Sequence, residues 1–388
     1  MDDLLVAAPR VLTPGGDLTP GWVAVTGDRI TGAGTGPAPA ASVRREVAGT
    51  VVPGFVDLHV HGGGGAGFGQ AADDSHGSDA VARAVAAHRR HGTTTTLASL
   101  VSARPAQLLR QVAALAELAE SGQVDGIHLE GPWLSPTRAG AHELAALRPP
   151  DAAELDAVLR AGRGHIRVVT LAPELAGGLD AVRRVVDAGA VAAIGHSDAD
   201  HATTRRAIDA GVRLGTHLFN ALPPLHHREP GPVGALLADP RCTVELIADG
   251  VHVHPDVLRV AVAAAGDGRW ALVTDAVSAA GTTSSTGDTS FTLGGVEVVV
   301  RAGVARTAAT GALAGSLLTM DAAVRCAVRL AGLPLPDAVA AASSTPAALL
   351  GLPDRGVIAA GARADLVVLD EDLHAVAVLH AGRWVGPR

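Results

Sequence analysis

Residues 51–62 read VVPGFVDLHVHG, an apolar run that ends in two histidines separated by one residue. This pattern predicts a β-strand over Val51–His61. Because alternate side chains of a strand point to the same face, His59 and His61 would lie together, where both imidazoles could bind one divalent ion. An HxH pair alone is weak evidence for a metal site. Two polar residues without a function at a strand end are about as probable an explanation.

Short strands and longer helical stretches alternate through residues 51–354, which is typical of a parallel sheet. Seven further strands are predicted over Thr93–Leu100, Asp125–Glu130, Ile166–Leu171, Val191–His196, Leu214–Asn220, Thr243–Asp249 and Ala271–Asp275. Helical spacing of Ala, Leu and Val predicts helices over Ser75–His91, Pro105–Ser121, Ala153–Ala161, Leu179–Ala188, Ala199–Ala210 and Pro255–Ala265. Eight βα units predict an α/β fold, namely a (β/α)8 TIM-like barrel.

Both ends of the chain differ from this pattern. Residues 1–50 contain short predicted strands broken by Gly and Pro, and residues 355–388 contain apolar stretches of the same character. We therefore expect the two ends to pair in one small β-sandwich domain, with the barrel domain of residues 51–354 inserted between them. A Gly-, Ser- and Thr-rich run over residues 279–309 predicts a hairpin after the eighth strand.

The composition excludes several classes of protein. Of 388 residues, 48% are hydrophobic and 18% charged, as expected of a folded protein with a large core. A net charge of -8, the lack of a basic run and only 2% aromatic residues argue against a nucleic-acid partner. The acidic N-terminus lacks the features of a signal peptide, so we expect neither export nor membrane insertion. Cys242 and Cys326 form no CxxC motif, which favours a reducing, cytoplasmic location.

Histidines and carboxylates recur at the C-terminal ends of the predicted strands, which form the active-site mouth of a βα barrel. The third strand ends with HLE at residues 128–130, the fifth with His196 and the eighth with Asp275, and the sixth carries His217. A single one of these would more often be a satisfied core histidine or a capping carboxylate. Together, several imidazoles and a carboxylate are the ligand set that Zn²⁺ or a similar ion prefers.

The chain contains no lysine. Many barrel hydrolases of this type bridge two metal ions through a carboxylated lysine, so Glu130 is the expected replacement. Asp275 is predicted to lie beside the metal, where it can accept a proton from metal-activated water and pass it to a leaving amine.

Several motifs resemble those of one known group of enzymes. VPGFVDLHVHG, HLEGPW, GHS, THLFNAL, IADGVHV, VTDAV and LAGSLLTM together resemble the amidohydrolase superfamily and, within it, the N-acetylglucosamine-6-phosphate deacetylases. The resemblance covers nearly the whole chain. The HxH pair and the Asp of the eighth strand mark only the superfamily, whereas HLEGPW, THLFNAL and REPGPVGA are more particular to these deacetylases.

The resemblance implies a metal centre and a mechanism. It implies Glu130, His196 and His217 as the main metal ligands and Asp275 as the catalytic acid and base. Members that keep HxH hold two ions, so room for a second ion is expected at the HxH pair named above, with Glu130 bridging. The expected ion is Zn²⁺, with Fe, Mn and Co as alternatives, and the expected assembly is a homodimer.

The same resemblance implies a set of substrate contacts. His142 is expected to polarise the acetyl carbonyl, and Ala141 to face the substrate beside it. The phosphate contacts are expected to be Asn220, Ala221, Arg228 and His252. The segment that closes over the sugar is expected to be Leu313, Ala314 and Gly315. His226 and His227 are further candidates at the mouth, whereas the histidines expected at the surface are His76, His88, His91, His165 and His201.

Other functions stay open at this point. The nearest alternative is an amidohydrolase that acts on another acylated amino-sugar phosphate, such as N-acetylgalactosamine 6-phosphate, or on a cyclic amide. A more distant alternative is a catalytically silent scaffold of the same fold. Such scaffolds typically lack a full ligand set, and this chain retains one.

Overall fold

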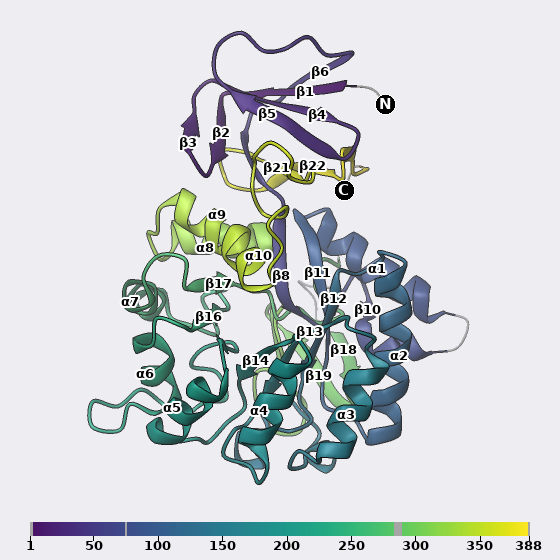
Figure 1. The fold of residues 1–388 in the computed structure, drawn as a ribbon, viewed down its shortest axis with the longest axis vertical. Helices are drawn as coiled ribbons and strands as arrows, with labels where there is room; N and C mark the ends of the chain where they lie inside the picture. Colours follow the sequence, from purple (N-terminus) through teal and green to yellow (C-terminus); the bar gives the residue numbers. More distant parts are fainter. Residues whose placement is uncertain (1–2, 74–75, 283–288, 387–388) are drawn as a thin grey trace.

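A computed structural model describes residues 3–73, 76–282 and 289–386 of the chain. A helix-wrapped parallel barrel carries a smaller β-rich part at one end (Figure 1). The predicted fold class is therefore confirmed. The predicted helix start at Ser75 and residues 283–288 of the predicted hairpin run lie outside the described residues.

The barrel consists of eight parallel strands that are adjacent in chain order. These strands are β8 (Phe55–Val60), β11 (Thr93–Leu100), β12 (Gly126–Glu130), β13 (Ile166–Leu171), β14 (Val191–Ile194), β15 (Leu214–Gly215), β16 (Thr243–Leu246) and β17 (Trp270–Leu272). All eight predicted barrel strands are present. Five of them end earlier than predicted, because the chain leaves the extended conformation where the site residues begin.

The first predicted strand, Val51–His61, is in fact two strands. Residues Thr50–Pro53 form β7, which belongs to a sheet of the smaller part, and β8 begins the barrel after Gly54. A Cβ atom at Gly54 would lie 2.1 Å from the Thr94 hydroxyl oxygen, so glycine permits this close passage between the two parts. The terminal sheets therefore lie at the N-terminal end of β8, opposite the two histidines at its C-terminal end.

Helices pack around the barrel, and the predicted six are all present within a few residues of their predicted bounds. The helices are α1 (Gly77–Arg89), α2 (Pro105–Glu120), α3 (Ala152–Ala161), α4 (Gly178–Asp187), α5 (His201–Ala210), α6 (Gly231–Ala238), α7 (Pro255–Ala265), α8 (Met320–Arg329), α9 (Leu335–Ala342) and α10 (Ser344–Leu349). Among the described residues, no helix combines the length and the apolar character needed to cross a bilayer.

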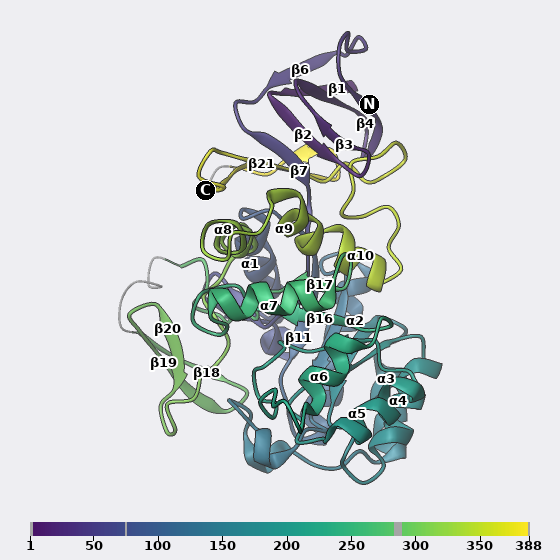
Figure 2. The ribbon, with the colours of Figure 1, turned by 90° about the vertical axis from the view of Figure 1, so that its left-hand side faces the viewer.

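Strands from both ends of the chain build the smaller part (Figure 2). One sheet has the order β5-β4-β1-β6 and the other the order β23-β22-β21-β7-β2-β3. Their bounds are β1 (Asp3–Ala8), β2 (Arg10–Thr13), β3 (Gly16–Leu18), β4 (Gly21–Thr26), β5 (Arg29–Gly34), β6 (Val43–Glu46), β21 (Leu366–Leu369), β22 (Ala375–His380) and β23 (Arg383–Trp384). Antiparallel pairing of β7 with β21 joins the two ends, as predicted.

A three-stranded antiparallel sheet follows the eighth barrel strand, where the sequence predicts a hairpin. It consists of β18 (Thr289–Leu293), β19 (Val296–Arg301) and β20 (Val304–Thr307) and stands beside the barrel in Figure 2. Its buried Val298 and Val300 pack with residues after the eighth strand, so it is anchored next to the strand ends of the barrel.

The seam between β8 and β17 closes the barrel. Beyond β17, the Asp275 N–H donates to the His59 carbonyl at 2.8 Å, and the His61 N–H donates to the Ala276 carbonyl at 2.8 Å. The fully buried Asp57 carboxylate accepts the Thr274 hydroxyl at 2.6 Å and the Thr274 N–H at 3.2 Å. Closure of the barrel and placement of the site residues thus depend on the same contacts.

Replacement of Asp57 by alanine is expected to destabilise the fold by about 3 kcal/mol, because it leaves buried donors of Thr274 without an acceptor. Thr274→Val removes only the hydroxyl and should cost about 1 kcal/mol. Urea unfolding of the metal-free protein measures both changes. An Asp57→Ala variant within about 0.5 kcal/mol of the wild type would contradict this role of the seam.

Candidate active site

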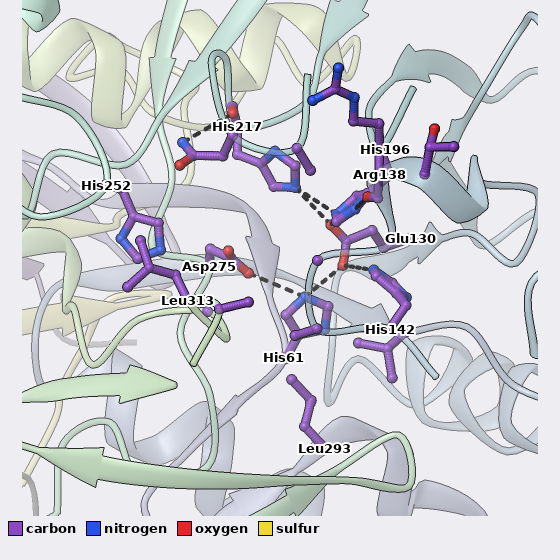
Figure 3. A pocket seen from close by; sticks show the side chains of 18 residues that line it. His61, Glu130, Arg138, His142, His196, His217, His252, Asp275, Leu293 and Leu313 are labelled. Carbon is purple, nitrogen blue, oxygen red and sulfur yellow. Dashed lines mark hydrogen bonds and ion pairs between the residues drawn. The ribbon is translucent and has the colours of Figure 1, made fainter. Parts of the chain in front are cut away.

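Glu130, at the end of β12, lies at the centre of a buried cluster of imidazoles (Figure 3). Its Oε1 atom lies 2.9 Å from His217 Nε2 and 3.1 Å from His196 Nε2. Its Oε2 atom lies 3.2 Å from His61 Nε2 and 3.3 Å from His142 Nε2. The structure therefore brings together residues that the sequence places on four different strands and one loop.

A second group of donor atoms adjoins the first. His59 Nε2 lies 3.1 Å from His61 Nε2 and 3.4 Å from Asp275 Oδ1, and His61 Nε2 lies 3.3 Å from the same oxygen. Glu130 also approaches this group, with Oε1 3.5 Å from His59 Nε2. One carboxylate thus stands between two sets of donors, each of the kind that holds a divalent metal ion.

The backbone at three of these positions is left-handed. His196, His217 and Asp275 have φ values of 46°, 30° and 49°, which are uncommon for residues other than glycine. Each follows the end of a barrel strand, so the turn directs its side chain into the mouth instead of along the strand. This local conformation explains why the strands are shorter than predicted and is the kind of strain that concentrates at functional sites.

Hydrogen bonds at Nδ1 fix the protonation of two imidazoles. His196 Nδ1 lies 2.8 Å from the Arg138 carbonyl oxygen, and His59 Nδ1 lies 3.1 Å from Glu245 Oε2. A carbonyl or carboxylate oxygen can only accept, so in the neutral form of each ring Nδ1 carries the proton and Nε2 keeps its lone pair. Both rings therefore present a metal-binding nitrogen to the centre of the cluster.

His142 has the opposite arrangement. Its Nδ1 accepts the Ser102 backbone N–H at 3.2 Å, so in the neutral ring the proton is on Nε2. Burial lowers the pKa of His142, which favours that neutral form. An N–H group pointing at the cluster cannot ligate a cation, but it can donate a hydrogen bond to a substrate oxygen.

The charges of the site suit a cation. Burial opposes ionisation of Glu130, but His59 and His142 favour the carboxylate and hold its pKa well below the usual range. Burial likewise opposes ionisation of Asp275, and the neighbouring His59 and His61 lower its pKa. Two buried carboxylates among nitrogen donors are the donor set of a divalent metal ion, so the residues present fit the predicted class of cofactor.

Most of the predicted substrate contacts line one cavity of about 340 Å³ above the cluster. The predicted residues that line it are Ala141, His142, Asn220, Ala221, His252, Leu313 and Gly315. Ala314 is fully buried behind this wall, where its N–H donates to the Ala305 carbonyl. Arg228 is exposed on the loop before α6, with its guanidinium 2.9 Å from His227 Nε2, and it does not line the cavity.

The remaining histidines mostly match their predicted places, with one correction. His76 and His201 are exposed, and His91 and His165 are half-buried. His88 is wrongly predicted as a surface residue, because it is only 1% exposed and its Nε2 lies 2.8 Å from the Gly62 carbonyl. Its place on the inner face of α1 explains the error. His226 and His227 are exposed on the same loop as Arg228 and do not line the cavity.

The sequence reasoning missed two residues of the site. Arg138 lines the cavity and pairs with Asp198 at 2.8 Å, while its carbonyl holds His196. Glu245 is fully buried in β16 and accepts both from His59 Nδ1 and from the His217 N–H at 3.1 Å. The only sequence signal for Glu245 was a charged residue within the apolar run TVELIA.

Glu245→Gln is expected to weaken metal binding at the His59 group by about 10- to 100-fold, because an amide holds the imidazole N–H less strongly than a carboxylate does. The metal content of the protein after dialysis against defined metal buffers measures the change. Glu297→Gln, at an exposed position of β19, is the matched control. Unchanged metal content and affinity in Glu245→Gln would rule out the orienting role.

Comparisons with known proteins agree with this geometry. The amidohydrolase family model matches residues 50–385. An N-acetylgalactosamine-6-phosphate deacetylase of Escherichia coli O157:H7 is 40% identical over 339 residues, which are 86% of this chain and 87% of the relative. An N-acetylglucosamine-6-phosphate deacetylase of Bos taurus is 39% identical over 359 residues, which are 89% of this chain and 86% of the relative.

A solved structure is similar over nearly the whole chain. A variant of N-acetyl-D-glucosamine-6-phosphate deacetylase from Mycobacterium smegmatis, in complex with N-acetyl-D-glucosamine-6-phosphate, has a TM-score of 0.93 and 51% sequence identity. The match covers 99% of this chain and 100% of that chain.

A parallel barrel whose strand ends gather imidazoles and carboxylates defines a metal-dependent hydrolase of the barrel type. The chain belongs to the amidohydrolase family and, within it, to the group of deacetylases that these relatives represent.

Proposed function

We propose that the protein hydrolyses N-acetyl-D-glucosamine 6-phosphate to D-glucosamine 6-phosphate and acetate, in the catabolism or recycling of amino sugars. The observation that carries this proposal is the arrangement of Glu130, His196, His217 and Asp275 at one end of a cavity that His252 lines as well. A hydrolytic centre and a site for an anionic group thus share one substrate-sized space.

The donor atoms support a divalent cation, and we infer Zn²⁺, with Fe, Mn and Co as alternatives. Glu130, His196 and His217 would hold one ion, and His59 and His61 would hold a second, because the Glu130 carboxylate approaches both sets. When bound, such an ion would acidify a water molecule and polarise the acetyl carbonyl.

Asp275 is the proposed acid and base. Its lowered pKa keeps it ionised, so it can accept a proton from the attacking water and then return this proton to the sugar nitrogen. His142 is proposed to donate its Nε2–H to the acetyl oxygen, because the Ser102 N–H occupies its other nitrogen. The two proton transfers by Asp275 leave the sugar nitrogen protonated for departure. The oxygen of the attacking water stays bonded to the acyl carbon.

The other end of the cavity is proposed to bind the phosphate. His252 Nδ1 lies 2.6 Å from Asp249 Oδ2, and although burial opposes it, this ion pair raises the pKa of His252. A protonated imidazole and the Asn220 amide, which line the same cavity, suit a phosphate group. Arg228 is proposed to add charge from its exposed loop, and Ala221 to contribute backbone contacts.

The proposed function is tested by acetate release from N-acetyl-D-glucosamine 6-phosphate, with and without a chelator. We expect turnover that the chelator abolishes and that added Zn²⁺ restores. We also expect little turnover of the unphosphorylated sugar, because it lacks the anionic group. A protein that binds metal but releases no acetate would contradict the proposal and favour a cyclic amide substrate, whereas a protein without metal or activity would favour a silent scaffold.

N-acetyl-D-galactosamine 6-phosphate is a second candidate substrate, favoured by the relative from Escherichia coli O157:H7 that carries this activity in its name. The two sugars differ only in configuration at one hydroxyl. Parallel kcat/KM measurements on both epimers decide between them.

We also propose a cytoplasmic homodimer. The exposed apolar side chains of Leu225, Val251, Val257 and Leu330 are candidates for such an interface, which would remove them from water. Light scattering at micromolar concentration tests this proposal, and a monomeric mass would contradict it.

A further inference from the structure

A second cavity, of about 440 Å³, adjoins the proposed catalytic cavity. It lies between the end of β11, the short helix η1 (Phe68–Ala72), α2 and the turn of the β18–β19 hairpin. Three residues line both cavities: His61, Val101 and Leu293. Because His61 belongs to the cluster around Glu130, the second cavity borders directly on the proposed reaction centre.

The geometry of an amide decides which part of the substrate faces the boundary between the two cavities, where His61, Val101 and Leu293 lie. Secondary amides strongly prefer the trans form, in which the nitrogen substituent and the acyl chain lie on opposite sides of the C–N bond. The proposed sugar-phosphate end lies toward His252 and Leu313. In Figure 3, His61 lies between His217 and Leu293. Leu293 is therefore on a different side of the cluster from His252. An acyl chain held at His142 would therefore point toward Leu293 and Val101.

The lining of the second cavity suits a neutral acyl chain. The border consists of the half-buried, apolar side chains of Val101 and Leu293. Beyond it, the lining polar side chains are the amides of Gln70, Gln107 and Gln111 and uncharged hydroxyls. Among the described residues that line this cavity, His61 is the only titratable one, so the space would exclude a charged group but accept a chain of a few carbons.

We propose that the second cavity is an acyl pocket, so that the enzyme hydrolyses N-propionyl and N-butyryl glucosamine 6-phosphate as well as the N-acetyl compound. Val101 and Leu293 set the acyl length that the site accepts. The inference rests on the proposed function, and the chemistry is unchanged: water adds to the acyl carbon, the C–N bond breaks, and one proton of that water passes to the nitrogen. The products are the amine and the longer carboxylic acid.

The test compares kcat/KM for the three N-acyl glucosamine 6-phosphates with the wild-type protein. A closed acyl pocket rejects an extra methylene by about 10- to 200-fold. We expect the propionyl and butyryl compounds to stay within about tenfold of the acetyl compound. Normal acetyl hydrolysis with a loss of more than about 100-fold for propionyl would overturn this inference alone. No hydrolysis of any of the three would instead refute the proposed function.

Two variants separate an acyl pocket from a mere route for water or acetate. Leu293→Phe should lower the butyryl-to-acetyl ratio of kcat/KM by at least about tenfold, whereas Leu293→Ala should raise it. Val299→Phe places the same ring on β19, outside both cavities, and should leave the ratio as in the wild type. An equal loss for all three substrates in Leu293→Phe, with the ratio unchanged, would indicate an exit route and overturn the acyl pocket.

Discussion

Asp275→Asn is expected to lower kcat for acetate release by at least about 100-fold, while the ion that we propose at Glu130, His196 and His217 stays in place. The asparagine amide has the shape of the carboxylate but cannot accept a proton from water or return one to the leaving nitrogen. Because Asp275 Oδ1 lies 3.3 Å from His61 Nε2, some weakening of the second metal site is expected as well.

Two measurements are needed to interpret this variant. Metal analysis by mass spectrometry shows whether the first ion is retained, and steady-state kinetics gives kcat. Asp256→Asn, at an exposed position of α7, is the matched control and should behave as the wild type does. Activity above about a hundredth of the wild-type value in Asp275→Asn, with metal bound, would assign the proton transfers to another group.

The order of strands and helices could be predicted from the sequence because the hydrophobic periodicity changes at each element. The ends of five of the eight barrel strands could not. His196, His217 and Asp275 continue the sequence pattern of their strands, but their left-handed backbone turns them out of the sheet. The break at Gly54 was missed for a related reason, since the residues on either side of it are equally apolar and belong to two different sheets.

The composition of the proposed site was predictable for residues at strand ends and in recognisable motifs. Residues that act through another side chain were not. Glu245 lies inside β16. A single sequence cannot show whether a buried carboxylate at such a position orients a metal-binding imidazole or has no role in the site. Arg138 ends the short 3-10 helix η2 (Pro136–Arg138), and its role depends on a backbone carbonyl that no residue pattern encodes. Arg228 stays a prediction for the phosphate, because it lies on an exposed loop and does not line the cavity.

Glu130→Gln is expected to remove metal from both sets of donors and to lower activity by more than about 100-fold. Five imidazole nitrogens lie within 3.5 Å of the Glu130 carboxylate, which therefore contacts both sets of donors. Loss of one partner from a buried charged cluster costs about 3–5 kcal/mol, which corresponds to more than about 100-fold in affinity.

The same substitution distinguishes a bridging carboxylate from an ordinary ligand. If Glu130 bridges, Glu130→Gln loses both ions together, whereas Glu245→Gln weakens mainly the ion at His59. Circular dichroism establishes that the fold is intact, and Glu117→Gln, on an exposed face of α2, serves as the control. Retention of one tightly bound ion at the His59 group in Glu130→Gln would mean that the two sets bind independently, because the shared carboxylate would then contribute to only one of them.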